Sequence, residues 1–258
     1  MLNAIILAAG QGSRLRPLTE DRPKCLVELA GRSLLERQLE TFAALGIEGV
    51  TIIGGYRAEQ LPGDVRVIVN PRYESTNMVE SLFCAQALMS GENDVIVSYG
   101  DIVFEPRVLA RLCDSTAEVA VVVDRRWRQL WEARMEDCLR DAETLKLAED
   151  GRIIELGKKA RSFDEIQGQY IGLIKFRAGW AVHLPKIYRT LLDIHGPAAQ
   201  TMYMTDFLQH LIDSGWRVQS VPVDGGWLEV DTLRDLQAYE NLRRAGELAR
   251  FYRLAEQG

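Results

Sequence analysis

Nearly continuous apolar runs alternate with helix-forming segments through the first half of the chain. The runs cover residues 2–8, 49–55, 94–101 and 117–124, with a shorter strand candidate at 64–69. Such runs are typical of strands buried on both faces. Helices are expected between them, over residues 31–46, 78–89 and 107–113. This β-α-β order predicts an α/β, Rossmann-like fold, with a mostly parallel sheet and helices on both faces.

The second half changes character. Residues 145–157 read as two strands joined by an Asp-Gly turn, and residues 168–176 read as another strand. Helical patterns follow around 178–194 and 202–213, and then a strand at 216–223. A long amphipathic helix is expected from about Asp231, because Leu233, Leu236, Leu242 and Leu248 recur at helical spacing. We therefore expect one domain over residues 1–258, with a small strand-rich insert at about 125–176.

Composition excludes several classes of function. The formal net charge of −6 argues against broad binding to nucleic acid. No run approaches 18 apolar residues, so we expect no membrane-spanning segment. The four cysteines are far apart and form no C-x-x-C pair, so neither a zinc site nor a disulfide framework is indicated. Reduced thiols and a cytoplasmic location are expected.

The first apolar run ends in a glycine-rich, basic loop, "ILAAGQGSRLRP", at residues 6–17. The following segment "SRLRPLTEDRPK" holds four basic and two acidic side chains, a local charge of +2. The pattern matches neither the Rossmann G-x-G-x-x-G fingerprint nor a Walker A loop. Glycines at the carboxyl end of a strand let backbone N–H groups approach phosphates closely. We interpret the loop as a triphosphate cradle; the alternative is a merely solvated loop.

The N-terminal segment "AIILAAGQGSRLRPLTEDRPKCLVELAGRSLLERQLE" resembles the signature of nucleotidyltransferases of the GT-A-like superfamily. The chain is most similar to bacterial phosphocholine cytidylyltransferases and their relatives that act on phosphonates. The likeness extends to "NPRYESTNMVESL", "YGDIVF" and "LEVDTLRDL". The middle segment, from "VVDRRWRQLWEAR" to "GQYIGLIKF", also resembles the glutamine phosphate cytidylyltransferase of capsular phosphoramidate synthesis. The resemblance implies a GT-A-type mixed sheet and transfer of a nucleoside monophosphate, with CTP as the donor.

The resemblance also implies roles for particular residues. Arg14 and Lys24 would be catalytic and hold the triphosphate, and Asp101 with Asp231 would bind Mg²⁺, the implied cofactor. Read singly, Asp101 is equally well a turn residue and Asp231 a helix N-cap. The implied nucleotide-binding residues are Leu7, Ala8, Ala9, Gly10, Gly12, Ser13, Arg14, Lys24, Gly55, Asn77, Ser81 and Asp101. The attacking group would be an anionic phosphate or phosphonate oxygen, so no general base is needed.

The acceptor is the open part of this interpretation. Sugar-1-phosphate relatives usually carry Glu-Lys-Pro where this chain reads "ELGKKA", so Lys158, as a catalytic residue, or Lys159 would meet the acceptor phosphate. Trp127, Trp131 and Trp227 would form an aromatic wall for an ammonium group, or would pack in the core or at its rim, which is the more common role of a single tryptophan. Acidic residues Glu132, Glu136, Asp141 and Glu143 would attract an amine or form a solvated face. The substrate-binding candidates are Trp127, Trp131, Lys159, Tyr170 and Glu229.

The resulting hypothesis is transfer of CMP from CTP to a small, amine-bearing phosphorylated or phosphonylated acceptor. Phosphocholine, 2-aminoethylphosphonate and glutamine phosphate all meet these terms. Alternatives are a sugar-1-phosphate nucleotidylyltransferase using UTP, dTTP or GTP, a GT-A glycosyltransferase, and a non-catalytic nucleotide-binding regulator. A homodimer is a further expectation, with neither nucleic acid nor membrane as a partner.

Overall fold

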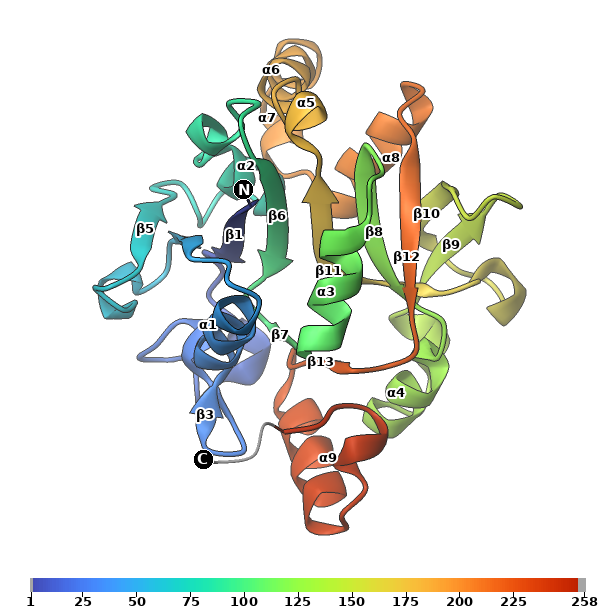
Figure 1. Cartoon of the computed structure of the whole chain (residues 1–258). Coiled ribbons are helices and arrows are strands. Elements are labelled where there is room, and N and C mark those ends of the chain that lie inside the picture. Colours follow the sequence, from blue (N-terminus) through green and yellow to red (C-terminus); the bar gives the residue numbers. More distant parts are fainter. Residues whose placement is uncertain (1, 255–258) are drawn as a thin grey trace.

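A seven-stranded sheet forms the centre of the computed structural model, which describes residues 2–254 (Figure 1). Its spatial order is β12-β8-β11-β6-β1-β4-β5. The strands are β1 (Leu2–Ala8), β4 (Gly49–Gly54), β5 (Arg66–Val69), β6 (Asp94–Tyr99), β8 (Val119–Asp124), β11 (Gln169–Phe176) and β12 (Val218–Val223). Only β11 runs antiparallel to its neighbours, β6 and β8. The predicted α/β fold with a mostly parallel sheet is confirmed.

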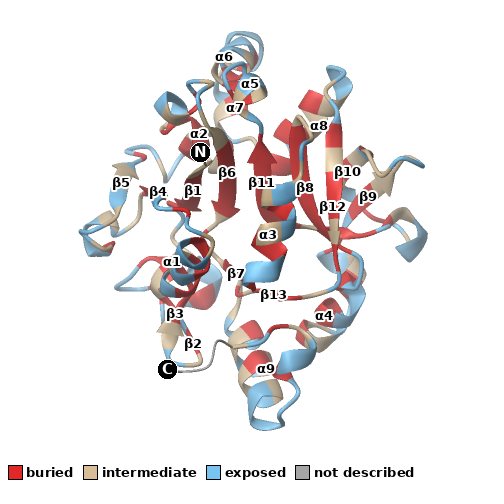
Figure 2. Cartoon of the chain, viewed as in Figure 1, coloured by how far each residue is buried: buried red, intermediate tan, exposed pale blue. Residues whose placement is uncertain are grey.

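Helices cover both faces of this sheet. On one side, α1 (Leu34–Ala44) and α3 (Pro106–Asp114) cover the sheet, and the same core continues to α4 (Trp127–Arg134) and α9 (Leu233–Arg244), which pack against each other beyond the ends of the strands (Figure 1). The other face packs against α2 (Met78–Phe83), α5 (Ala178–Ala181), α6 (Leu184–His195), α7 (Pro197–Gln200) and α8 (Met204–Asp213). Strand β1 supplies both cores, because Ala4, Ile6 and Ala8 face the first set while Ile5 and Leu7 face the second. The central strands are accordingly buried along much of their length (Figure 2).

Local signals in the sequence explain where α1 begins and ends. The Ser33 hydroxyl accepts from the Glu36 amide, and a Glu36 carboxylate oxygen accepts from the Ser33 amide at 2.7 Å. This is the predicted capping box, which satisfies backbone donors at the start of the helix. Gly46 follows the helix in a left-handed conformation, with φ of 71°.

Two short antiparallel pairs lie outside the main sheet and matter for the site. Strands β7 (Ile102–Phe104) and β13 (Trp227–Glu229) pair with each other directly beyond β6. Strands β2 (Glu28–Leu29) and β3 (Arg32–Ser33) form a second small pair that leads into α1. The β7–β13 pair was not expected from the sequence, because three-residue strands show no clear periodicity.

The segment at 125–176 differs from the expected strand-rich insert in two ways. It opens with helix α4, and its last strand, β11, belongs to the central sheet. Only β9 (Glu143–Leu147) and β10 (Ile153–Lys159) form the predicted hairpin, with Gly151 at φ of 79° in the turn. The Trp and Leu side chains of α4 recur at helical spacing, a signal hidden by the many charged residues between them.

The C-terminal helix is shorter than the sequence predicted. It ends at Arg244, and Gly246 follows with φ of 74°. Leu248 lies in a separate 3₁₀ turn, Leu248–Arg250, and still reaches the core. The segment at 78–89 is likewise split, because α2 ends at Phe83 and a 3₁₀ turn, Gln86–Leu88, follows.

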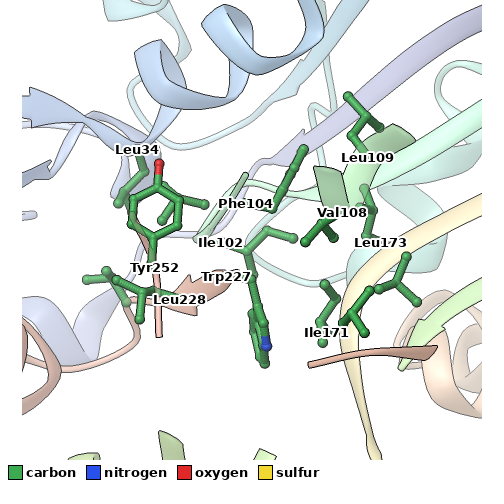
Figure 3. Close-up of a cluster of buried hydrophobic side chains, with 14 of the residues drawn as sticks. Leu34, Ile102, Phe104, Val108, Leu109, Ile171, Leu173, Trp227, Leu228 and Tyr252 are labelled. Carbon is green, nitrogen blue, oxygen red and sulfur yellow. The ribbon is translucent and has the colours of Figure 1, made fainter. Parts of the chain in front are cut away.

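A cluster of large side chains joins α1, β7, β13 and the C-terminal segment (Figure 3). Phe104 is 1% exposed and packs edge-to-face on Phe42, with ring centroids 5.8 Å apart. Trp227 is equally buried, and its indole N–H donates to Asp124 at 2.8 Å.

None of the helices within residues 2–254 is both long enough and apolar enough to cross a membrane.

We expect Phe104→Ala to lower the free energy of unfolding by about 3–5 kcal/mol, because it removes a fully buried ring and leaves a cavity. Leu233→Ala is the control, since Leu233 is 39% exposed and should change stability by roughly 0.5 kcal/mol or less. Equilibrium urea unfolding measures both. A cost for Phe104→Ala no larger than that of the control would contradict this packing.

Candidate active site

The glycine loop after β1 wraps around the side chain of Lys24. Gly12 has φ of 63°, and a Cβ placed there would lie 2.8 Å from the Lys24 Cβ. The Thr19 hydroxyl donates to the Gly12 carbonyl at 2.8 Å and closes the loop. Glycine is therefore required at position 12 for two reasons, a left-handed backbone and the close approach of a lysine.

Lys24 lies between two carboxylates. Its Nζ donates to Asp101 Oδ2 at 2.7 Å and to Asp231 Oδ1 at 2.8 Å. Arg14 Nη1 lies 2.6 Å from the other oxygen of Asp231. The side chains of Lys24, Asp101 and Asp231 are 13–22% exposed, whereas that of Arg14 is 68% exposed. Two anions and two cations thus meet at the rim of the glycine loop.

Asp101 and Asp231 are 130 positions apart, and the β7–β13 pair brings them together. Asp101 follows β6 and precedes β7, while Asp231 follows β13. The Val230 amide donates to the Asp101 carbonyl at 2.9 Å, which fixes the two chain segments side by side. The prediction that both aspartates meet at one edge of the sheet agrees with this geometry.

Electrostatics keep Lys24 charged. Burial alone would lower the pKa of Lys24, but the carboxylates of Asp101 and Asp231 raise it above its ordinary value. Lys24 is therefore a permanent cation at the pH of a cell. Burial raises the pKa of the neighbouring Cys25 thiol to about 12, so Cys25 is not a thiolate nucleophile.

A pocket opens beside the cluster, between the glycine loop and α2. Of the residues implied to bind nucleotide, Leu7, Ala8, Ala9, Gly10, Lys24, Asn77, Ser81 and Asp101 line it. Gly12, Ser13, Arg14 and Gly55 are not among its lining residues. Gly55 instead supports the loop from behind, since a Cβ there would lie 2.6 Å from the Ala9 carbonyl oxygen.

Sequence reasoning missed part of the pocket wall: Cys25, Tyr73, Thr76, Met78, Tyr99 and Gly100. Behind the wall, the Asn70 amide donates to the hydroxyls of Thr76 and Ser81, each at 3.0 Å. Asn70 is 1% exposed, so this arrangement is fixed from within the core. The run "NPRYESTN" was the available signal, because polar residues cluster there just before a helix.

The two lysines assigned to the acceptor lie elsewhere. Lys158 Nζ pairs with Glu155 at 2.6 Å on the same strand, and its side chain is 63% exposed. Lys159 Nζ donates to the carbonyls of Leu139 and Arg140. Neither lysine lines the pocket. Both therefore serve the β10 hairpin and its neighbouring turn in this structure.

The three tryptophans are buried, in place of the open aromatic wall expected from the sequence. Trp127, Trp131 and Trp227 are 1–5% exposed. Trp131 packs against the other two rings, with centroids 5.7 and 6.0 Å apart, and its indole N–H donates to Asp141 at 3.0 Å. Large apolar rings are more often packed in the core than left open to solvent, and the structure agrees with that alternative, so a substrate-facing wall of Trp127 and Trp131 is ruled out in this structure.

The acidic residues of the 127–143 segment separate into different environments. Asp141 accepts a hydrogen bond from the Trp131 indole, and Glu132 forms an ion pair with Arg128 at 2.7 Å. Glu136 is 92% exposed at its side chain. Repulsion by Asp141 and Asp206 adds to burial in raising the pKa of Glu143. The segment is thus partly a solvated face and partly a set of local ion pairs.

The remaining substrate candidates, Tyr170 and Glu229, lie behind the aspartates. The Tyr170 ring packs edge-to-face on Tyr99, a pocket residue, with centroids 5.6 Å apart. Its hydroxyl is buried without a hydrogen-bond partner among the described residues. Glu229 Oε2 lies 2.8 Å from Arg134 Nη1. Burial, only partly offset by Arg134, raises the pKa of Glu229 to about 7.

The residues present fit a divalent cation bound together with phosphates. Asp101 Oδ1 is buried and has no hydrogen-bond partner within residues 2–254. The other oxygen, Oδ2, shares the Lys24 ammonium group with Asp231. The described residues contain no group of three or more metal-ligating side chains. A two-carboxylate site of this kind suits Mg²⁺, which usually takes one or two carboxylates plus phosphate and water oxygens.

Comparisons with known proteins identify relatives of this chain. Residues 4–166 match the family model described as the MobA-like NTP transferase domain. The chain is 41% identical over 249 residues to the CTP:phosphoglutamine cytidylyltransferase of Campylobacter jejuni, covering 92% of this chain and 98% of the relative. It is 36% identical over 109 residues to the choline-phosphate cytidylyltransferase of Streptococcus pneumoniae, covering 40% and 47%. The resemblance inferred from the sequence motifs is confirmed.

Solved structures show the same fold. The CTP:phosphocholine cytidylyltransferase from Streptococcus pneumoniae superimposes with a TM-score of 0.74 at 23% identity, over 94% of this chain and 99% of that one. The inositol-1-phosphate CTP transferase from T. maritima gives a TM-score of 0.73 at 21% identity, over 98% of both chains. At these identities the likeness concerns the fold alone.

We expect Gly12→Ala to weaken binding of a nucleoside triphosphate by roughly tenfold or more, because the new methyl group displaces Lys24. Gly31→Ala is a matched control: Gly31 also has positive φ, 79°, but a Cβ there meets nothing within 4 Å. Both variants should lose about 1–2 kcal/mol of stability from backbone strain. Calorimetric titration with CTP separates them, and equal loss of affinity in both would contradict the role of Gly12.

Proposed function

This chain belongs to the MobA-like NTP transferase family, and we propose that it transfers CMP from CTP to glutamine phosphate or a close amine-bearing analogue. The observation that carries the proposal is the position of Lys24, held between Asp101 and Asp231 at the mouth of the glycine-loop pocket. The choice of CTP and of the acceptor is supported by the 41% identical relative, which this chain covers over 98% of its length.

In the proposed reaction, an oxygen of the acceptor phosphate attacks the α-phosphorus of CTP. A new P–O bond forms on that side, the bond to the β-phosphate bridging oxygen breaks, and pyrophosphate leaves. The attacking oxygen is already anionic, so the protein supplies position and positive charge and needs no base. The pocket between β1 and α2 holds the nucleoside, and the glycine loop presents backbone N–H groups to the phosphates.

The two cations have different tasks. Lys24 is rigid and largely buried, which suits contact with the α-phosphate, where charge shifts during transfer. Arg14 is mostly exposed and, within residues 2–254, pairs only with Asp231, which suits capture of the outgoing pyrophosphate. When the triphosphate binds, Lys24 and Arg14 would leave their carboxylate partners and contact phosphate oxygens instead.

Asp101 and Asp231 would hold Mg²⁺ in this proposal. The ion would neutralise triphosphate charge and orient the phosphates for in-line attack. The buried Asp101 Oδ1, which has no hydrogen-bond partner among the described residues, supports this assignment. All four cysteines are free thiols, which supports a reducing, cytoplasmic setting.

We expect Asp101→Asn to lower kcat/KM for CTP by about 10²-fold or more, because the variant keeps the shape of the side chain but loses the charge that binds the cation. Asp114→Asn, at the exposed end of α3, is the control and should stay within about twofold of wild type. Release of pyrophosphate as a function of Mg²⁺ concentration measures both. If Asp101→Asn folds and keeps most of its activity, the metal assignment is wrong.

The identity of the acceptor is tested by measuring kcat/KM for a panel of phosphorylated and phosphonylated acceptors with each of the four NTPs. We expect CTP with glutamine phosphate to give the highest kcat/KM, at least about tenfold above phosphocholine and 2-aminoethylphosphonate, since the most similar full-length relative reported above is named for phosphoglutamine. An amine-free phosphate ester should be poorer still. A higher kcat/KM for a hexose-1-phosphate with UTP or dTTP would replace this proposal with sugar-nucleotide synthesis.

A further inference from the structure

A buried ion-pair network lies directly behind Asp231, and we propose that two of its members, Arg134 and Asp235, are positioning residues for that carboxylate. The inference rests on the proposed function, in which Asp231 faces Mg²⁺ and the triphosphate. Neither Arg134 nor Asp235 lines the nucleotide pocket. Both therefore act through Asp231 and not on the substrate.

Asp235 fixes the backbone of the Asp231 segment. One of its oxygens, Oδ2, accepts from the Asp231 amide at 2.9 Å and from the Thr232 amide at 2.7 Å. Asp235 is 2% exposed and stands in the first turn of α9, where its own amide donates to the Thr232 hydroxyl. An ordinary capping box needs one backbone bond to this carboxylate, and here there are two. The additional bond comes from the amide of Asp231, the residue whose side chain contacts Lys24 and Arg14.

Arg134 fixes Asp235 in turn. It is 3% exposed, and its Nε donates to Asp235 Oδ1 at 3.0 Å while Nη1 lies 2.8 Å from Glu229. The guanidinium also sits 5.2 Å from the Trp131 ring centroid, within cation–π range. Arg134 thus hydrogen-bonds Asp235 on α9 and forms an ion pair with Glu229 on β13, and these two acidic residues flank Asp231 in sequence.

A network of this kind is poorly explained by stability alone. Burying charges costs desolvation energy, and replacing a buried ion pair by apolar side chains is often neutral or stabilising. Here Arg134 Nε holds Asp235 Oδ1 at 3.0 Å, which leaves Oδ2 to accept from the Asp231 and Thr232 amides. Precise placement of Asp231 is the benefit that offsets the desolvation.

The network also links two elements that are far apart in the sequence. Arg134 ends α4, the helix that opens the 125–176 segment, whereas Asp231 and Asp235 belong to the C-terminal β13–α9 unit. The rest of α4 packs its tryptophans into the same core. A displacement of α4 would therefore shift the Asp231 segment through one side chain, the guanidinium of Arg134.

The first test needs no substrate. Amide hydrogen exchange, followed by NMR, is compared in wild type, Arg134→Lys and Arg128→Lys. Lysine keeps the charge but cannot reach Asp235 and Glu229 with a rigid fork, so the Asp231 and Thr232 amides should exchange at least about tenfold faster, with amides inside β13 unchanged. Arg128 is an exposed residue of the same helix, paired with Glu132, and its variant should match wild type. Unchanged protection in Arg134→Lys would overturn the proposal.

The second test is a double-mutant cycle of Arg134→Lys with Asp231→Asn, measured by pyrophosphate release. We expect Arg134→Lys alone to lower kcat by about tenfold with the acceptor KM within about threefold. In the Asp231→Asn background the same change should cost less than about threefold, because its target is already altered. Equal penalties in both backgrounds would overturn the positioning role, since a merely structural defect is additive.

Two further outcomes are distinguishable. If Arg134→Lys does not fold, Asp235→Asn replaces it, because asparagine keeps one acceptor oxygen while losing the charge, and the same two readouts apply. If wild type releases no pyrophosphate from CTP with any acceptor, the proposed function fails. The hydrogen-exchange comparison then still decides whether Arg134 holds the Asp231 segment.

Discussion

The Lys24 ammonium group between Asp101 and Asp231 is the contact on which the rest of this architecture depends. It joins the loop after β1, the end of β6 and the end of β13 through two bonds of 2.7 and 2.8 Å. The cluster is only partly buried, so its charges can exchange partners with an incoming polyanion without full desolvation. An anionic substrate and its counter-ion would each find partners of opposite charge already in place.

The fold prepares that contact by several independent means. The parallel strands β1 and β6 deliver the glycine loop and Asp101 to the same edge of the sheet. The β7–β13 pair brings Asp231 to that edge, and the buried cluster around Phe104 and Trp227 fixes the position of the pair. Gly12 leaves room for the lysine stem. Because each element comes from a different part of the chain, the site forms only when the whole domain has folded.

The central sheet and the residues that meet at Lys24 could be predicted from the sequence, and particular residues show why. The run from Leu2 to Ala8 reads as a doubly buried strand, and the capping box at Ser33 and Glu36 marks its helix. Gly12 and Lys24 were found because a phosphate loop needs a special backbone and a cation close together. Asp101 and Asp231 were found through motif resemblance, and the structure brings them within reach of one ammonium group.

Other features could not be predicted because they depend on long-range packing. Whether Trp131 faces solvent or core is decided by α9 and β13, which lie about 100 positions away along the chain. The same distance separates Arg134 from Asp235, so no local pattern reveals the network. Lys158 and Lys159 were chosen because they stand where sugar-1-phosphate relatives carry Glu-Lys-Pro, and the hairpin they belong to turns them toward Glu155 and two backbone carbonyls instead.

The central claim is that the Lys24–Asp101–Asp231 cluster receives the triphosphate and its metal ion. Crystals grown with Mn²⁺ and a non-hydrolysable CTP analogue test it most directly through anomalous diffraction. We expect an anomalous peak bound by both aspartates, with the α-phosphate within hydrogen-bond distance of Lys24 Nζ. A nucleotide bound away from the glycine loop, or one bound there while Lys24 still bridges both carboxylates and no metal contacts them, would contradict the account.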